Sequence, residues 1–242
     1  MRIGEALKEI SANNVTLAEK QQQVYDAGVA EGRAQGGYTE GFDAGRQAEY
    51  DAFWDVFQGY GNRRYYNQTF YNSTKAGQGW TDETFNPKYP IVTDTGYNNN
   101  IFAYCSFTDT KVEIDLSASA SAQGGFLFCT MLKTIRKVTL PTDENANLTN
   151  IFYRCDSLEN IVFGGEIVQT GISFQWSTNL SRESITNIIN ALSLNVADKT
   201  MTFSKTAVNK AFETSEGAND GNTSAEWLNL IATKPGWTIS LV

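Results

Sequence analysis

The chain has 242 residues, of which 41% are hydrophobic and 19% are charged, and its formal net charge is -8. This composition excludes a wholly disordered chain, and the length allows one substantial core with an appendage. The excess of acidic residues argues against nucleic-acid binding, because the only dense basic cluster is Arg63-Arg64. The absence of histidine excludes every histidine-dependent nucleophile or general base.

Export and membrane signals are missing from the sequence. No apolar run reaches the roughly 18 residues that a membrane-spanning helix needs, and residues 1–5 do not begin an apolar signal segment. We therefore expect synthesis in the cytosol, no export by the standard route and no membrane insertion.

Residues 1–58 are predicted to form a long helix that assembles copies of the chain. Apolar or core-compatible residues follow a spacing of four and three from Ile3, at Leu7, Ile10, Asn14, Leu17, Gln21 and Val24. This is the a/d pattern of a coiled coil, and polar residues at a positions set register and strand number. We expect a homo-oligomer, with a trimer preferred and a dimer or hexamer left open. The alternative is an amphipathic helix packed on its own domain.

The second half of this segment is rich in glycine. Two series recur every four residues, at Gly28, Gly32 and Gly36 and at Gly37, Gly41 and Gly45. Each glycine costs a helix roughly 1 kcal/mol relative to alanine, so a groove for close helix or ring packing would compensate. A flexible stalk is the alternative. The aromatic stretch 52–58 ends the helix before Gly59.

Residues 59–93 are predicted to be an irregular connector containing Trp80 and Phe85. Its aromatic side chains could bind sugar if exposed, but anchoring of a loop to a core is the commoner role.

The clearest pattern is a repeat at intervals of about two dozen residues. Its anchors are Phe102-x-x-Cys105, Phe126-x-x-Cys129, Phe152-x-x-Cys155 and Phe174-x-x-Ser177. An apolar series follows each anchor: Phe107, Val112, Ile114 and Leu116; Leu132, Ile135, Val138 and Leu140; Leu158, Ile161 and Phe163; and Leu180. This period predicts a solenoid over residues 94–180, whose stacked coils bury what one coil cannot. The three cysteines are predicted to be buried thiols, because neither a paired Cys-x-x-Cys nor a histidine is present to support zinc.

The segments 101–107, 127–135 and 151–161 resemble the F-x-x-C-x-x-L-x-x-I core of BspA-type leucine-rich repeats. The third copy is the most faithful, the first lacks the leucine, and Ser177 replaces cysteine in the fourth, as in a capping repeat. The resemblance implies a leucine-rich-repeat solenoid of the kind found in bacterial surface adhesins and in phage and prophage tail proteins. The glycine-rich helix and the connector 80–89 are also similar to regions that accompany such repeats in phage proteins of gut Gram-positive bacteria.

Residues 181–242 are predicted to form an α/β cap that closes the solenoid. Ser181 is a plausible N-cap for a helix with an apolar stripe at Ile185, Ile188, Ile189 and Leu192. A strand at 201–203, a helix at 207–212, a polar loop at 215–222, a helix containing Trp227, Leu228 and Ile231, and a final strand at 237–242 complete it. The fold class is therefore α+β: a long N-terminal helix, a short repeat solenoid and a cap.

No catalytic, cofactor or metal site is predicted. The pairs Asp82-Glu83 and Asp143-Glu144 could contribute to a glycosidase only if their carboxylates faced each other, and adjacent acids on loops are usually solvated. The stretch 219–222 lacks the spaced acids of a calcium loop.

These observations favour a bacteriophage structural protein of the tail, baseplate or fibre region, assembled in the host cytoplasm and located in the virion. Its solenoid would contact another virion protein or a host-surface glycan or protein, through residues that the sequence does not identify. A bacterial surface adhesin or interaction module is the second hypothesis, and a glycan hydrolase the third.

Overall fold

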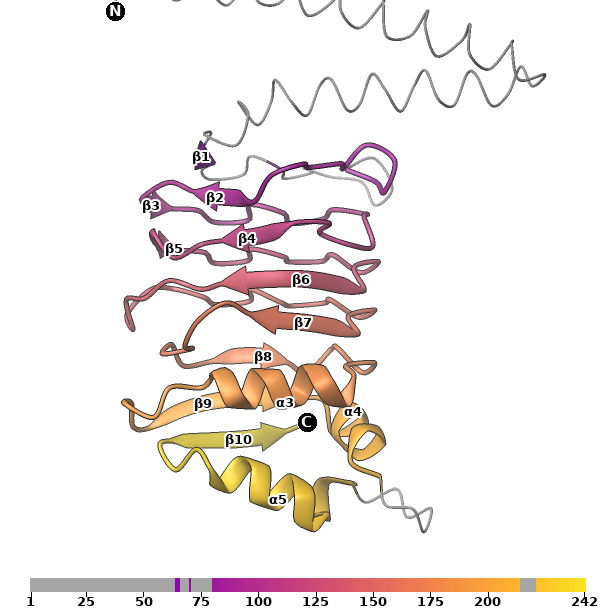
Figure 1. The fold of residues 1–242 in the computed structure, drawn as a ribbon, viewed down its shortest axis with the longest axis vertical. Coiled ribbons are helices and arrows are strands. Elements are labelled where there is room, and N and C mark those ends of the chain that lie inside the picture. The colour runs from indigo at the N-terminus through magenta and orange to yellow at the C-terminus, as the bar shows by residue number, and fades with distance from the viewer. Residues whose placement is uncertain (1–63, 66–69, 71–79, 214–220) are drawn as a thin grey trace, which may run out of the picture. The chain divides into compact units, whose positions relative to one another are not determined.

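The computed structural model describes residues 64–65, 70, 80–213 and 221–242. Contacts divide the chain into two compact units, Met1–Asn62 and Arg63–Val242. The coiled-coil helix expected in residues 1–58 lies outside the described residues, so it remains a prediction. The described part of the second unit is a β-solenoid of about four turns with few helices (Figure 1).

Parallel strands stack along the solenoid, as Figure 1 shows. The first sheet contains β1 (Arg64–Tyr65), β2 (Ile91–Thr93), β4 (Glu113–Asp115), β6 (Thr134–Thr139) and β7 (Asn160–Phe163), in that order. The second contains β8 (Ile172–Phe174), β9 (Lys199–Phe203) and β10 (Trp237–Leu241), and a short third pairs β3 (Gly96–Tyr97) with β5 (Ser119–Ser121). Every pairing is parallel, which indicates that each turn of the chain returns to the same side before the next strand begins.

A column of phenylalanine rings fills the centre of the solenoid. Adjacent rings are near-parallel, with centroids 5.0, 5.0, 5.7, 4.8 and 5.8 Å apart along the series Phe70, Phe102, Phe126, Phe152, Phe174 and Phe203. The anchors predicted from the repeat therefore form one continuous stack. Phe70 and Phe203 extend it beyond the four anchors seen in the sequence.

The cysteines form a second column beside the phenylalanines. Each thiol donates to the carbonyl oxygen of the phenylalanine one turn earlier: Cys105 to Phe70 at 3.2 Å, Cys129 to Phe102 at 3.0 Å, and Cys155 to Phe126 at 3.2 Å. In the next turn the Ser177 hydroxyl donates to the Cys155 carbonyl at 3.0 Å. All three cysteines are free and buried, which confirms the prediction of buried thiols.

Burial makes these thiols poor nucleophiles. It raises the pKa of Cys105 and of Cys155 well above the ordinary cysteine value. We expect no thiol of the native chain to react with 5,5′-dithiobis(2-nitrobenzoate) at pH 8 during mixing, and all three to react in guanidinium chloride. Fast reaction of even one thiol in the native chain would contradict the buried column.

The helix predicted after Ser181 is confirmed as α3 (Arg182–Ala191). The Ser181 side chain accepts a hydrogen bond from the Ser184 amide at 3.2 Å, as expected of an N-cap. Ser184 in turn lies against the edge of β7, where its hydroxyl accepts a hydrogen bond from the Ile161 amide at 3.0 Å. The helix thus closes the first sheet.

The solenoid does not end at α3, however, because the second sheet continues through β9 and β10. The predicted strand, two helices and final strand of the cap are present as β9, α4 (Lys205–Ala211), α5 (Ala225–Ala232) and β10. The predicted polar loop at 215–222 lies mostly outside the described residues, and its last two residues belong to a short helix, η2 (Gly221–Thr223). Trp227 of α5 is buried against Phe203 and Phe212, with ring centroids 6.2 and 5.2 Å away. The cap therefore contains both Phe203, the last ring of the stack, and Trp227, which covers it.

Candidate binding surface

Three of the four acidic side chains named from the sequence, Asp82, Asp143 and Glu144, contact other groups of the solenoid. The Asp82 carboxylate accepts hydrogen bonds from the Thr108 amide at 2.7 Å and the Thr108 hydroxyl at 2.9 Å. Asp143 accepts the Asn145 amide at 2.9 Å, and Glu144 lies 3.3 Å from the Lys199 ammonium. Asp82, Asp143 and Glu144 therefore each have a structural partner.

The connector aromatics anchor the first turn. Phe85 is completely buried and stacks on Phe107 at a centroid distance of 4.0 Å. Trp80 is half-buried and meets Phe70 edge to face at 5.9 Å. These contacts favour anchoring over an exposed sugar-binding loop.

A line of large side chains runs along the outside of the turns, and we call it the outer row. It consists of Tyr104, Phe128, Tyr153, Arg154 and Trp176. The ring centroids of consecutive aromatic members are 5.2, 5.5 and 5.9 Å apart. The Arg154 guanidinium lies 4.7 Å from the Trp176 ring centroid, within range of a cation–π contact. The row therefore crosses four successive repeats.

The outer row remains open to solvent despite these contacts. Phe128 is 36% exposed and Trp176 is 38% exposed. Arg154 also pairs with Asp156 at 2.9 Å, so the row carries a polar group beside its apolar rings. Aromatic residues and arginine are the side chains most enriched where proteins bind partners.

Three members of the row have a left-handed backbone, with φ of 64° at Tyr104, 56° at Phe128 and 61° at Arg154. Each of these three repeats also has a second left-handed position, four residues earlier, which is filled by Asn100, Gly124 and Asn150. Asparagine and glycine tolerate this conformation, whereas other residues lose roughly 1–2 kcal/mol in it.

The two left-handed positions act as an internal comparison. The earlier position of each repeat has asparagine or glycine, which the left-handed backbone favours. The later position has Tyr104, Phe128 or Arg154, which this backbone disfavours. Contacts within the row offset part of this cost. Strain of this kind is found most often at functional sites, so we take the outer row as the candidate binding surface.

Two substitutions of Phe128 separate strain from ring contacts. Phe128→Asn and Phe128→Ala both remove the ring, but only asparagine suits a φ of 56°. We expect the asparagine variant to be more stable than the alanine variant by about 1 kcal/mol in urea unfolding. Equal stabilities would show that the backbone at this position is not strained.

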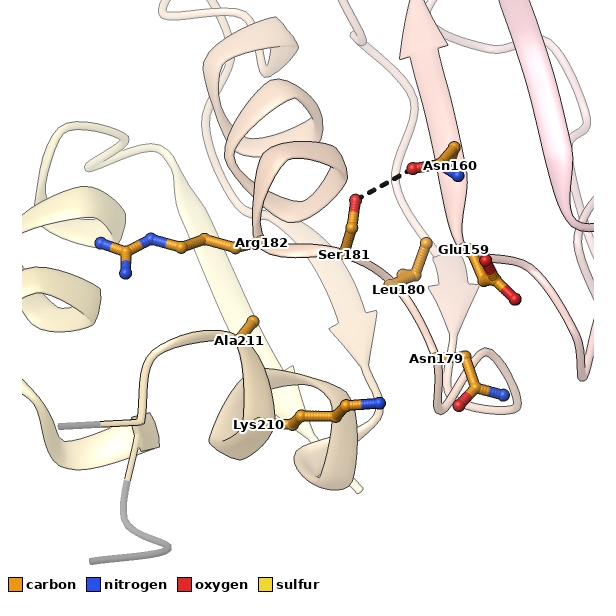
Figure 2. A pocket seen from close by; sticks show the side chains of 8 residues that line it. All are labelled: Glu159, Asn160, Asn179, Leu180, Ser181, Arg182, Lys210 and Ala211. Carbon is orange, nitrogen blue, oxygen red and sulfur yellow. Dashed lines mark hydrogen bonds between the residues drawn. The ribbon is translucent and has the colours of Figure 1, made fainter. Parts of the chain in front are cut away.

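A polar pocket of about 500 Å³ lies where α3 begins. Figure 2 shows its lining, which comes from the start of β7, the segment before α3 and the end of α4: Glu159, Asn160, Asn179, Leu180, Ser181, Arg182, Lys210 and Ala211. The Ser181 hydroxyl donates to the Asn160 side-chain oxygen at 3.3 Å. The pocket thus brings together residues that are far apart in the sequence.

The charged side chains around this pocket differ in whether they form ion pairs. Arg182 points away from the other lining side chains, forms an ion pair with Glu226 and lies over the Phe212 ring. The Glu159 carboxylate is 4.0 Å from the Lys133 ammonium. Lys210 projects toward Asn179 and Leu180 (Figure 2), and no ion pair to it is found among the described residues. The pocket can offer hydrogen bonds to a small polar group.

No protein-family model, curated protein or solved structure matches this chain. Within the described ranges, no cluster of three or more histidine, cysteine, aspartate or glutamate side chains is suited to hold a metal ion. A search of the same residues finds no helix with the length and apolar character needed to cross a membrane.

Proposed function

We propose that the chain is a structural and binding protein of a bacteriophage virion, in the tail, baseplate or fibre region. In this proposal residues 1–58 assemble a homotrimer and attach it to the particle. The solenoid is of the BspA-type leucine-rich-repeat kind and presents the outer row to another virion protein or to a glycan or protein of the host surface.

The outer row is the observation that supports a binding role. In three of its four repeats it places a large side chain, Tyr104, Phe128 or Arg154, on a left-handed backbone. Phe128 and Trp176 each keep more than a third of their surface exposed. A rigid solenoid holds such a row in line, which lowers the conformational entropy lost on binding. The virion setting comes from the repeat resemblance, Phe-x-x-Cys with its following leucine and isoleucine.

Oligomerisation would make a weak contact effective. Three copies held together raise the local concentration of the second and third binding surfaces once the first is engaged. A modest affinity at each outer row then gives strong attachment of the whole particle.

The location can be tested by immunogold electron microscopy in the bacterium whose genome carries the gene, after prophage induction. Antibodies raised against the full chain are expected to label one end of the released particles. Labelling of the cell wall with none on particles would instead support the bacterial adhesin hypothesis.

The binding surface can be tested by measuring how the purified protein binds to two separate targets, host cell walls and virions. Purified full chain should bind isolated host cell walls or virions, and Trp176→Ala should reduce this binding at least tenfold. Trp176 is chosen because it is the most exposed ring of the row, at 38%. Leu194→Ala is the control, because this side chain is 66% exposed and is not in the row. Equal binding by the two variants would remove the outer row from the proposal.

The assembly can be tested by light scattering of the full chain. We expect a trimer, and a lower mass for Ile10→Asp, which places a charge in the predicted heptad core. Glu9→Ala, outside that core, should leave the mass unchanged. A monomeric wild-type chain would contradict the predicted coiled coil.

A further inference from the structure

The first two rings of the outer row are stacked against each other. Tyr104 and Phe128 are near-parallel, with an angle of 11° between their planes, and their centroids are 5.2 Å apart. Coplanar rings placed side by side cannot come this close, because their hydrogen atoms would overlap, so these two rings must lie face against face. A partner that approaches this part of the row therefore meets ring edges.

Neighbouring side chains cover further ring faces along the row. Tyr153 lies at 75° to both Phe128 and Trp176, so in each pair the edge of one ring covers part of a face of the other. The Arg154 guanidinium lies over Trp176, 4.7 Å from its ring centroid. Sugars bind aromatic residues by placing C–H groups on the negative face of an open ring. This arrangement therefore disfavours a glycan as the ligand of the row.

The spacing of the row matches that of an α-helix. Consecutive aromatic rings are 5.2 to 5.9 Å apart, and these distances bracket the helical pitch of about 5.4 Å. A helix laid along the row can place one side chain per turn, at i, i+4 and i+7, between successive rings. An extended strand repeats on one face about every 6.7 Å, so it falls roughly 1 Å out of step at each ring.

The cap leaves this surface open. Phe128 is 36% exposed and Trp176 is 38% exposed with α3, α4 and α5 in place. The row ends at Trp176, because the next equivalent position, Lys205, is the first residue of α4. The open part of the row is therefore long enough for about three turns of a partner helix.

Arg154 adds a charge to the apolar rings. Its Nε and Nη2 atoms donate hydrogen bonds to the Asp156 carboxylate at 3.2 and 2.9 Å. Its Nη1 atom has no hydrogen-bond partner among the residues that the structure describes. A guanidinium carries several N–H donors in a fixed fork, so Arg154 can bind a second carboxylate while it stays over Trp176.

We infer that the outer row binds an amphipathic α-helix of a partner protein. The helix lies along the row, with apolar side chains one turn apart between the rings and an aspartate or glutamate opposite Arg154. Recognition of a helix through one residue per turn is a common mode of protein binding. The inference rests on the proposed function, because it names the partner of the same surface.

Photo-crosslinking from two positions of the row tests this geometry. Phe128 and Trp176 are replaced one at a time by p-benzoylphenylalanine in the full-length chain, which is then irradiated on virions and on host cell walls. The two positions are two turns apart, about 10–11 Å, a distance that spans about seven residues of helix or about three of strand. We expect the crosslinked residues, located by mass spectrometry, to lie about seven positions apart in one polypeptide. The same replacement of Leu194, outside the row, should give no crosslink to that polypeptide.

The other results of this experiment separate the inference from the proposed function. A separation of about three residues would indicate an extended partner, and crosslinks to carbohydrate alone would indicate a glycan. Either result, or no crosslink from both positions, would overturn the helix and leave a binding role for the row in place. Equal binding by Trp176→Ala and Leu194→Ala would instead remove the proposed function, and the inference with it.

Arg154→Gln provides a second measurement without a photoreactive group. Its binding to the same targets should be about tenfold weaker than that of the wild type at low salt, and this difference should shrink as salt is added, because salt screens a pair of charges. Loss of a purely structural contact would give a difference that does not depend on salt. That result, or equal binding at low salt, would contradict a carboxylate opposite Arg154.

Discussion

Replacing Phe126 with alanine is expected to lower the free energy of unfolding by about 3–5 kcal/mol, the usual cost of deleting a buried ring. Phe126 is completely buried and stacks on both Phe102 and Phe152, with centroids 5.0 and 5.7 Å away. The neighbouring turns cannot move in to fill the cavity left by the ring, because hydrogen bonds between the parallel strands fix their positions. Thermal unfolding followed by circular dichroism should show the melting temperature fall by about 6–20 °C.

Phe128→Ala is the matched control for this substitution, since the same ring is removed two residues away. Phe128 is 36% exposed and its backbone is strained, so its loss should cost no more than about 1.5 kcal/mol. If the two variants were equally stable, the central stack would not be the main source of stability of the solenoid.

Replacing Trp227 with alanine is expected to lower the free energy of unfolding by about 3–5 kcal/mol as well. This side chain is 2% exposed and covers Phe203, the last ring of the stack. Because its loss uncovers the end of the solenoid, hydrogen exchange should speed up first in α5 and β10. Urea unfolding measures the total effect.

Leu228→Ala, the next residue of α5, is the control for Trp227. Its side chain is 49% exposed, so we expect a change of less than about 0.5 kcal/mol. A large loss of stability in Leu228→Ala together with a small one in Trp227→Ala would contradict the packing of α5 through Trp227.

The solenoid could be predicted from the sequence because its anchors are chemically unusual. A phenylalanine three residues before a cysteine is rare enough that three copies identify the period, and the fourth copy shows that serine can replace cysteine. The structure gives the reason: Ser177 donates a hydrogen bond to the preceding turn, as the thiols do.

Phe70 and Phe203, the first and last rings of the stack, could not be recognised from the sequence because they lack the cysteine that marks the repeat. Phe70 and Phe203 are followed three residues later by Ser73 and Thr206, so the cysteine that marks the repeat is absent. Longer intervening segments also hide their register. A search for phenylalanine followed by any small hydroxyl or thiol residue would have included both.

The outer row was also missed, although a signal for it exists. Each anchor is followed two residues later by Tyr104, Phe128, Arg154 and Trp176 in turn. The sequence does not show that the backbone is left-handed at the first three of these positions, because this conformation is set by the turn geometry. The polar pocket has no sequence signal at all, since Glu159, Asn179 and Lys210 meet only after α4 folds back on the solenoid.

The cysteine column also has an evolutionary consequence. Each thiol donates its hydrogen bond to the turn before it, so removing or duplicating one whole repeat would rejoin equivalent hydrogen-bond partners. Unequal recombination could therefore change the length of the protein in steps of roughly 4.8 Å, the spacing of neighbouring strands. The reach of its surface would be adjustable between related genes without any new packing solution.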